Sequence, residues 1–285
     1  MHTLIYLNNR VVNAARARVA FNPGALLYGR GVFTTLAVHH ARPFLWPEHY
    51  ARLQEHAERT GIEAVEFSEA SIGAALAELI EANEIAEGRA RVSLLTSAEA
   101  VIWQTSAGDA KQKTRLLIIT GERRAACEEG VAITVSPYRV NTLSPLTGIK
   151  SVNYLDHILS WEEARGRDFD EAVVLNERGE VVSTTLANLF WVRDGHLHTP
   201  ALSTGALAGT TRALVIRLAG ELSMPFVESV NDLAPLAEAD EIFLTSAGLG
   251  LQFVNAFDYH RYTITVGSLA VRLREALRQF TLQAS

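Results

Sequence analysis

Apolar side chains recur at the spacing of an α-helix in five stretches of the chain. Proline favours the first turn of a helix and serine caps its start, so Pro47 and Ser68 mark the beginnings of the first two predicted helices. The predicted helices begin at Pro47, after Ser68, after Lys150, after Gly209 and near Leu269.

Short apolar runs bounded by Gly, Pro, Asn or Asp lie between these helices and predict strands. They cover residues 28–38, 43–46, 90–96, 114–120, 131–136, 171–175, 187–192 and 241–245. Hairpin turns are expected at Asn8-Asn9, at residues 177–179 and at Asp194-Gly195, because these residue types tolerate the positive φ of tight turns. Helices and strands therefore share the chain as in an α+β or α/β fold.

The most charged connector, residues 121–130, separates two groups of predicted elements. We expect a small N-terminal domain at residues 1–122 and a larger C-terminal domain at residues 123–285. A chain of 285 residues is long enough for each of them to bury a core.

The composition limits the class of protein. Hydrophobic residues make up 48% and charged residues 20%, which is typical of a soluble globular protein. The net charge is −6 and no basic cluster is present, so nucleic acid is not a favoured partner. One cysteine, Cys127, fits a reducing compartment, and neither a membrane-spanning run nor a signal peptide is visible. We therefore expect a cytoplasmic enzyme.

Lys150 is the residue whose chemistry is least ordinary. Only three of the 26 basic residues are lysines, and Lys111 and Lys113 lie in a polar stretch that reads as a solvated loop. Lys150 instead precedes an apolar helical pattern formed by Val152, Leu155, Ile158 and Leu159. An ammonium with apolar neighbours can lose its proton, as a Schiff-base lysine must. A lone lysine of this kind is more often a snorkelling side chain. The residues around it must therefore show whether it is a Schiff-base lysine.

Two segments and one arginine are candidates for holding an anion. Residues 209–212 (Gly-Thr-Thr-Arg) open a helix, whose free N–H groups and dipole attract phosphate, although threonine there can also be a simple cap. Residues 245–248 (Thr-Ser-Ala-Gly) follow a strand and are small enough for close backbone approach, or for an ordinary tight turn. Arg52 can close a phosphate clamp or form a surface ion pair. A lysine with two anion sites suggests pyridoxal 5'-phosphate (PLP).

Six pieces of the sequence resemble the class IV, or fold type IV, PLP-dependent enzymes. This family includes branched-chain aminotransferase, D-amino-acid aminotransferase and 4-amino-4-deoxychorismate lyase. The pieces occur in family order, span roughly residues 3 to 255, and lie at residues 28–35, 49–53, 148–155, 187–190, 206–212 and 245–248. The resemblance implies a D-amino-acid aminotransferase-like fold, with a small N-terminal α/β domain and a larger C-terminal domain with a barrel-like sheet. It also implies a homodimer.

The resemblance assigns roles to individual residues. Lys150 matches the Schiff-base lysine, and Tyr154 matches a tyrosine beside the ring oxygen of the cofactor. The matches to cofactor-holding positions are Arg52, Asn188, Thr210, Thr211, Thr245, Ser246 and Ala247. Tyr28 and Phe33 fall where the small domain faces substrate.

One position departs from the family pattern. The family places a glutamate, which protonates the pyridine nitrogen, five residues before the asparagine that matches Asn188, and here that position is Ser183. To take the place of that glutamate, Glu180 would have to shift by three residues along the strand. An odd shift in a strand also turns the side chain to the other face. A serine hydroxyl leaves the ring a weaker electron sink, so we expect slower transamination than in a glutamate version.

Smaller departures concern the substrate side. Arg30 and Thr34 stand where the family often has acidic residues, and residues 33–35 and 187–191 resemble the deoxychorismate lyase branch more than the branched-chain one. Arg30 is a candidate for binding a substrate carboxylate, with Arg91 and Arg139 as weaker candidates. His39-His40 lies in a turn without a carboxylate at ligand spacing, and we interpret it as solvated, so no metal site is expected.

The sequence leads to a PLP-dependent aminotransferase as the main hypothesis. Deoxychorismate lyase activity, in which the same deprotonation leads to pyruvate elimination, is the first alternative. A PLP-binding protein with weak catalysis, motivated by Ser183, is the second. The identity of the substrate and the stereochemistry of the amine are left open.

Overall fold

The computed structural model describes residues 1–18, 24–96 and 114–284, which form two compact units. Unit 1 contains Met1–Arg124 together with the short segment Ile149–Asn153, and unit 2 contains Ala125–Gly148 and Tyr154–Ala284. Lys111 and Lys113 lie outside the described residues. The predicted boundary at residue 122 lies close to the end of the long piece of unit 1, and the division into two domains remains a proposal.

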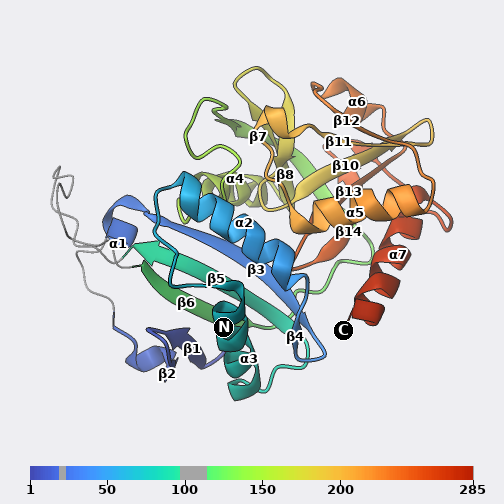
Figure 1. The fold of residues 1–285 in the computed structure, drawn as a ribbon. Coiled ribbons are helices and arrows are strands. Elements are labelled where there is room, and N and C mark those ends of the chain that lie inside the picture. Colours follow the sequence, from blue (N-terminus) through green and yellow to red (C-terminus); the bar gives the residue numbers. More distant parts are fainter. Residues whose placement is uncertain (19–23, 97–113, 285) are drawn as a thin grey trace. The chain divides into compact units, whose positions relative to one another are not determined.

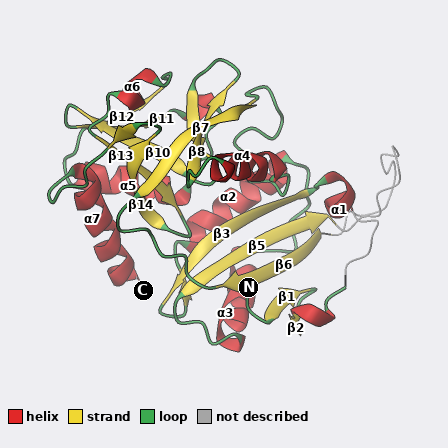
Figure 2. Cartoon of the chain, turned by 180° about the vertical axis from the view of Figure 1, so that it is seen from behind, coloured by secondary structure: helices red, strands yellow, loops and turns green. Residues whose placement is uncertain are grey.

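Unit 1 is an antiparallel sheet with helices packed on it (Figures 1 and 2). The sheet order is β2-β1-β6-β5-β3-β4, and α2 and α3 cover the same face of it. The elements are β1 (Leu4–Leu7), β2 (Val11–Asn13), η1 (Ala14–Arg16), α1 (Gly24–Tyr28), β3 (Gly31–His39), β4 (Arg42–Pro43), α2 (Trp46–Arg59), α3 (Glu69–Ala82), β5 (Gly88–Thr96) and β6 (Thr114–Gly121).

Helix α3 shows why the sequence pattern was informative here. The hydroxyl of Ser68 accepts a hydrogen bond from the N–H of Ser71 at 3.1 Å, as its cap position requires. Ile72, Leu76 and Leu79 recur on one face and are fully buried in the core of unit 1. The predicted hairpin at Asn8-Asn9 is also confirmed, since both residues have positive φ and β1 pairs with β2.

Two predicted strand boundaries in unit 1 were wrong. The chain is helical through Tyr28 and enters β3 only at Gly31, because Gly29 adopts a φ of 62° and turns the chain between them. The predicted strand at residues 43–46 ends at Pro43, and Leu45, at a φ of 54°, leads directly into α2. Both differences come from local left-handed turns that an apolar pattern does not reveal.

Unit 2 contains a mixed, nine-stranded sheet. Its order is β12-β11-β10-β13-β14-β7-β8-β9 with β15 beside β14, and β9 contacts β10 and β11 near the opposite end of this path. The sheet therefore curls back on itself, which confirms the predicted barrel-like sheet. The elements are β7 (Val131–Val140), α4 (Leu155–Gly166), β8 (Glu171–Asn176), β9 (Val181–Thr184), β10 (Asn188–Arg193), β11 (His196–Pro200), η2 (Leu202–Thr204), α5 (Thr210–Glu221), β12 (Phe226–Ser229), α6 (Ala234–Ala237), β13 (Glu241–Ser246), β14 (Gly250–Phe257), β15 (His260–Arg261) and α7 (Leu269–Ala284).

The short segment Ile149–Asn153 belongs to unit 1 and pairs with β3 there. The N–H of Phe33 donates to the carbonyl of Lys150, and the N–H of Val152 donates to the carbonyl of Gly31, both at 2.9 Å. Val32 and Ser151 form an antiparallel bridge between these two bonds. Lys150 is thereby fixed to the edge of β3 by its own backbone.

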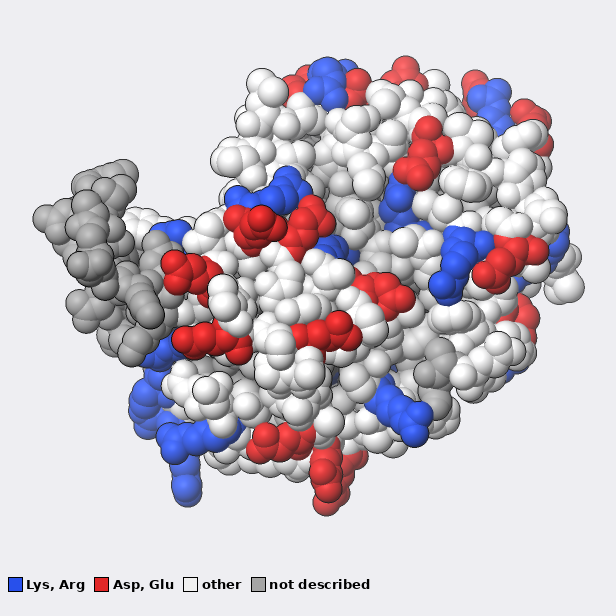
Figure 3. All heavy atoms as spheres, viewed as in Figure 1, with Lys and Arg blue, Asp and Glu red and all other residues white. Residues whose placement is uncertain are grey.

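Charged side chains are dispersed over the surface. On the face shown in Figure 3, acidic and basic side chains are interspersed over most of the area. Among the described helices, none is both long and apolar enough to cross a membrane.

Candidate active site

The side chain of Lys150 lies against the ring of Phe33. Its Nζ is 4.6 Å from the ring centroid, and the Cζ of Arg91 is 3.6 Å from the same centroid. Burial, together with the positive charges of Arg52 and Arg91, lowers the pKa of Lys150 to about 7. A large share of this amine is therefore neutral at neutral pH, as a nucleophilic lysine requires.

The predicted surroundings of Lys150 were wrong in one respect. Leu155, Ile158 and Leu159 were expected as its apolar neighbours, but they lie on α4 and are 64%, 42% and 43% exposed. After burial, the largest influences on the lysine are the two guanidinium groups. The low pKa thus follows partly from like charge, which the local sequence pattern does not show.

Arg52 is buried on α2 and held by Thr34 of β3. Its Nη2 donates to the hydroxyl of Thr34 at 2.9 Å, and this hydroxyl lies 2.6 Å from Nδ1 of His49. Because Thr34 accepts from arginine, its own proton is directed to His49 Nδ1. Burial and then the charge of Arg52 lower the pKa of His49 to about 3, so this histidine is neutral and suited to accept.

His56 provides a second buried neutral imidazole beside Lys150. The backbone N–H of Lys150 donates to His56 Nδ1 at 3.1 Å. Burial and the charge of Arg52 lower the pKa of His56 to about 4. Sequence reasoning missed both histidines, although their helical spacing from Arg52 already placed all three on one side of α2.

The first predicted anion site lies at the start of α5. Gly209 precedes the helix with no side-chain cap, and the first turn carries no acidic residue. A Cβ on Gly209 would lie 2.0 Å from Oδ1 of Asn188, so any larger residue there would displace the Asn188 amide. Asn188 also donates to the carbonyl of Leu207 at 2.9 Å, while Thr210 and Thr211 are buried in the first turn. The open helix N-terminus is chemically suited to a phosphate.

The second predicted anion site adjoins this one across the sheet. Thr245 of β13 is in register with Asn188 of β10. Its hydroxyl is buried and, within the described part of the chain, has no hydrogen-bond partner. Ser246 and Ala247 follow it and are partly exposed. A buried hydroxyl that lacks a partner is costly, so this group fits a bound anion better than an empty site.

Ser183 lies in β9, opposite Val174 of β8, and is partly exposed. Its hydroxyl donates to the carbonyl of Thr184 at 2.9 Å. The carboxylate of Glu180 accepts from Asn176 and pairs with Arg178, so it is already engaged outside β9. No shift of Glu180 along the strand is seen.

Tyr154 is supported by a chain of contacts in unit 2. Its ring stacks on that of His157 with centroids 4.4 Å apart, and His157 Nδ1 donates to the carbonyl of Thr185 at 2.8 Å. The carboxylate of Glu171, which is buried, accepts from the N–H and the hydroxyl of Thr185 and from the N–H of Leu186. Burial raises the pKa of Glu171, and these donors oppose the shift. Neither Glu171 nor His157 was identified from the sequence.

The predicted substrate residues lie in different surroundings. Tyr28 is 50% exposed on α1, and Phe33 is buried beside Lys150. Arg30 is partly exposed, and no described carboxylate pairs with it. Arg139 is exposed and donates to carbonyls of its own strand. Of the three candidate arginines, Arg91 is the one that contacts the ring of Phe33, which Lys150 also contacts.

His39 contacts a carboxylate that is distant in the sequence. Its Nδ1 lies 2.9 Å from the carboxylate of Glu87. The side chain of Glu87 is exposed, and the two residues are 48 positions apart in the sequence, so no local spacing indicated this contact. Among the described residues, no cluster of three or more His, Cys, Asp or Glu could hold a metal ion.

Comparison with known proteins adds to this geometry. The family model described as amino-transferase class IV matches residues 31–257. A protein of Methanocaldococcus jannaschii, provisionally named a branched-chain-amino-acid aminotransferase, is 32% identical over 96% of this chain and 95% of its own length. The aminodeoxychorismate lyase of Bacillus subtilis is 28% identical over 86% of this chain and 84% of its own.

The fold matches solved structures equally well. The branched-chain aminotransferase of Thermoproteus uzoniensis, solved with norvaline, superposes with a TM-score of 0.90. That match covers all of this chain and 96% of the other, at 28% identity. The predicted fold type IV architecture is confirmed.

Proposed function

Because the chain belongs to the class IV aminotransferase family, we propose that it moves an amino group between an amino acid and a keto acid, with Lys150 carrying PLP. The observation that carries the proposal is the pKa of about 7 at Lys150, beside Phe33 and Arg91. No other described lysine exists in the chain. When bound, PLP supplies an aldehyde that condenses with amines and a ring that withdraws electrons from the substrate Cα.

The residues of the chain supply the remaining functions. We propose that Lys150 Nζ accepts and returns the proton at the substrate Cα, which its near-neutral pKa favours. The α5 N-terminus with Thr210 and Thr211, the hydroxyl of Thr245, and Arg52 are proposed to hold the phosphate. Ser246, Ala247 and Asn188 would line this part of the site and Tyr154 the ring oxygen, as the family resemblance implies.

The substrate side is proposed to bind a carboxylate. Arg91 shares the ring of Phe33 with the lysine, since both groups contact it. Arg30 lacks a described carboxylate partner and is the second candidate, and Tyr28 is exposed enough to meet a ligand. An α-amino acid fits a site with one amine-binding and one carboxylate-binding group.

A homodimer is proposed for two reasons. The family resemblance implies one, and Leu155, Ile158 and Leu159 form an exposed apolar face of α4 at helical spacing. We also propose a cytoplasmic location, since the single cysteine, Cys127, allows no disulfide within the chain. Sedimentation of the purified protein tests the oligomeric state, and a monomer at micromolar concentration would contradict the first proposal.

Deoxychorismate lyase activity is the alternative function. It is favoured by the Phe33-Thr34-Thr35 sequence, by residues 187–191, and by the likeness to the Bacillus subtilis lyase. Incubation with an amino donor and a keto acid, followed by the spectral change to the pyridoxamine form, detects a transaminase. Pyruvate release from aminodeoxychorismate without an amino acceptor detects a lyase.

The decisive experiment is an absorbance spectrum before and after borohydride, with peptide mapping of the reduced protein. The wild-type chain should show a near-visible band that borohydride abolishes, with the reduced adduct on Lys150. Lys150→Ala should show neither. A colourless wild-type protein in excess PLP, or an adduct on Lys111 or Lys113, would end the proposal. A band that responds to no amine or keto acid would indicate a binding protein with weak catalysis.

A further inference from the structure

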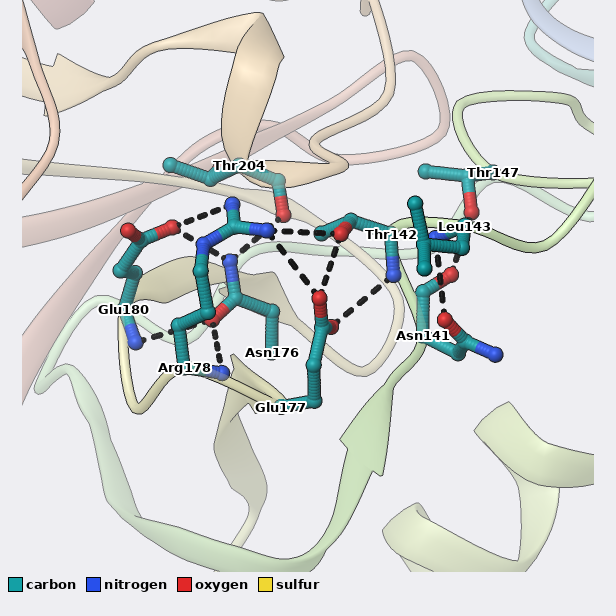
Figure 4. Close-up of polar contacts among 9 residues, drawn as sticks. All are labelled: Asn141, Thr142, Leu143, Thr147, Asn176, Glu177, Arg178, Glu180 and Thr204. Carbon is teal, nitrogen blue, oxygen red and sulfur yellow. Dashed lines mark hydrogen bonds and ion pairs between the residues drawn. The ribbon is translucent and has the colours of Figure 1, made fainter.

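The turn between β8 and β9 carries an unusual concentration of polar contacts (Figure 4). We call Asn176, Glu177, Arg178 and Glu180 the turn hub. Arg178 pairs with Glu177 at 3.1 Å and with Glu180 at 2.6 Å, so the hub is internally connected. Its side chains also reach out to two other segments of unit 2, as the sticks in Figure 4 show.

The first contacted segment is the loop that leads from β7 to Lys150. The carboxylate of Glu177 accepts from the N–H of Thr142 at 2.9 Å and from its hydroxyl at 2.5 Å. Arg178 donates to the same hydroxyl at 2.7 Å. The loop is braced internally as well, because the hydroxyl of Thr147 donates to the carbonyl of Asn141 at 2.6 Å. Gly148 then ends the loop, just before the segment that carries the lysine.

The second contacted segment is the one that leads into α5. The amide of Asn176 donates to the carbonyl of Thr204 at 3.1 Å and to the carboxylate of Glu180 at 2.7 Å. Its oxygen accepts from the N–H groups of Arg178 and Glu180, both at 3.0 Å. Asn176 is fully buried, and these four bonds use all of its hydrogen-bonding capacity. The end of η2 is thus tied to the same turn as the lysine loop.

The two segments also pack directly on each other. Gly205, at a φ of 101°, follows Thr204, and a Cβ there would lie 3.1 Å from Cγ2 of Thr147 and 3.3 Å from Cγ1 of Val140. A Cβ on Gly148 would lie 3.8 Å from the carbonyl of Ala206. The two segments are in close contact at these glycines. A displacement of one segment would therefore displace the other, because closely packed groups leave no free space between them.

The contacts converge on three places that matter for the proposed chemistry. The loop at Thr142 continues to Lys150, the segment at Thr204 continues to the N-terminus of α5, and the hub itself continues through β9 to Ser183. We propose that the turn hub is a positioning device that sets the approach segments to all three at once, with Glu177 and Thr142 as its positioning residues. This inference rests on the proposed function, in which these three places meet PLP.

The hub is built to stay ionised. Hydrogen bonds from the hydroxyl and N–H of Thr142, together with the charge of Arg178, lower the pKa of Glu177 to about 2. Hydrogen bonds from Arg178 and Asn176 lower the pKa of Glu180 as well. Both carboxylates are therefore negative at any working pH, and the hub acts as a fixed support with no pH switch.

Thr142→Val tests the hub with little change of shape, and Thr142→Ser is the matched control that keeps the hydroxyl. Hydrogen–deuterium exchange of the PLP-free proteins measures the segments directly, without requiring PLP to bind. In Thr142→Val we expect faster exchange at residues 141–148 and also at residues 202–209. The Cγ2 methyl of Thr142 lies beside Gly205, and valine keeps this methyl, so a change at residues 202–209 would report the lost hydroxyl. Fluorescence titration with PLP should show a dissociation constant raised about tenfold. Thr142→Ser keeps the hydroxyl and loses only the Cγ2 methyl beside Gly205, so it should stay close to the wild type in both measurements.

The outcomes separate this inference from the proposed function. If Thr142→Val exchanges like Thr142→Ser at residues 202–209, or if exchange rises evenly across unit 2, the hub does not couple the segments. If the exchange result is as expected but PLP affinity is unchanged relative to the wild type, the positioning role is also wrong. A wild type that binds no PLP overturns the proposed function, and the hub's role toward PLP with it.

Discussion

The backbone N–H of Lys150 donates a hydrogen bond to Nδ1 of His56 at 3.1 Å. An imidazole nitrogen can accept only when it carries no proton, so this bond fixes the tautomer of His56 with its proton on Nε2. The low pKa of His56, about 4, keeps the acceptor available across the physiological range. The lysine segment is therefore attached to α2 by His56 and to β3 by its own backbone.

His56→Leu should loosen this attachment. The change leaves the N–H of Lys150 without its acceptor, and an unsatisfied buried donor costs about 1–3 kcal/mol. We expect the free energy of unfolding in urea to fall by that amount, with faster hydrogen exchange at residues 149–153. His56→Asn can still offer an oxygen near the position of Nδ1 and should lose less. Equal losses in the two variants would show that burial of the ring, and not the bond, is what matters.

The reactivity of Lys150 should depend on pH through Arg91. In the wild type, the rate of covalent labelling of Lys150 by an aldehyde under reducing conditions should rise with a midpoint near pH 7, because only the neutral amine reacts. Arg91→Met removes a nearby positive charge and should move the midpoint upward. Arg89→Met, on the exposed part of the same strand, is the control and should leave the midpoint in place. A midpoint that does not move in Arg91→Met would contradict the charge argument.

Acid should destabilise unit 1 through its buried histidines. The folded-state pKa values of His49 and His56, about 3 and about 4, lie below the unfolded value of 6.5. Between these values the unfolded chain binds more protons, so stability falls as pH falls from about 6.5 toward 4, by at most about 1.4 kcal/mol per pH unit and histidine. Urea unfolding at pH 7, 5.5 and 4.5 measures the slope. His49→Gln should make it shallower, and an unchanged slope would show that His49 does not titrate on unfolding.

How much of this site the sequence revealed depends on how local each signal is. Lys150 and the α5 start could be proposed from the sequence because their signals are local: a rare residue type, and a glycine before two threonines. Glu180 lies in the turn before β9, where its carboxylate contacts Asn176 and Arg178, so it is not placed in the strand beside Ser183. His56 was missed because its partner lies far along the chain. Helical periodicity tells which side chains share a face, and it does not tell which backbone group lies against that face.

The apolar pattern after Lys150 also shows what helical periodicity cannot predict. The spacing of Leu155, Ile158 and Leu159 correctly predicted α4, yet these side chains are exposed. Periodicity identifies a shared face and leaves open what covers it. The buried Glu171 was missed for a related reason. It lies at the start of β8, whereas its partners Thr185 and Leu186 lie between β9 and β10.

Ser183→Glu should speed the half-reaction of transamination. The strand register places position 183 on β9 opposite Val174, and the nearby carboxylate of Glu180 is engaged by Asn176 and Arg178. An introduced carboxylate would favour a proton on the pyridine nitrogen and so strengthen the ring as an electron sink. We expect single-turnover rates with an amino donor to rise about tenfold, which corresponds to roughly 1.4 kcal/mol in the barrier. Ser183→Gln has a similar size without the charge and should give no such gain. If the two variants react at the same rate, the electronic role assigned to position 183 is wrong, and the protein works with a neutral ring.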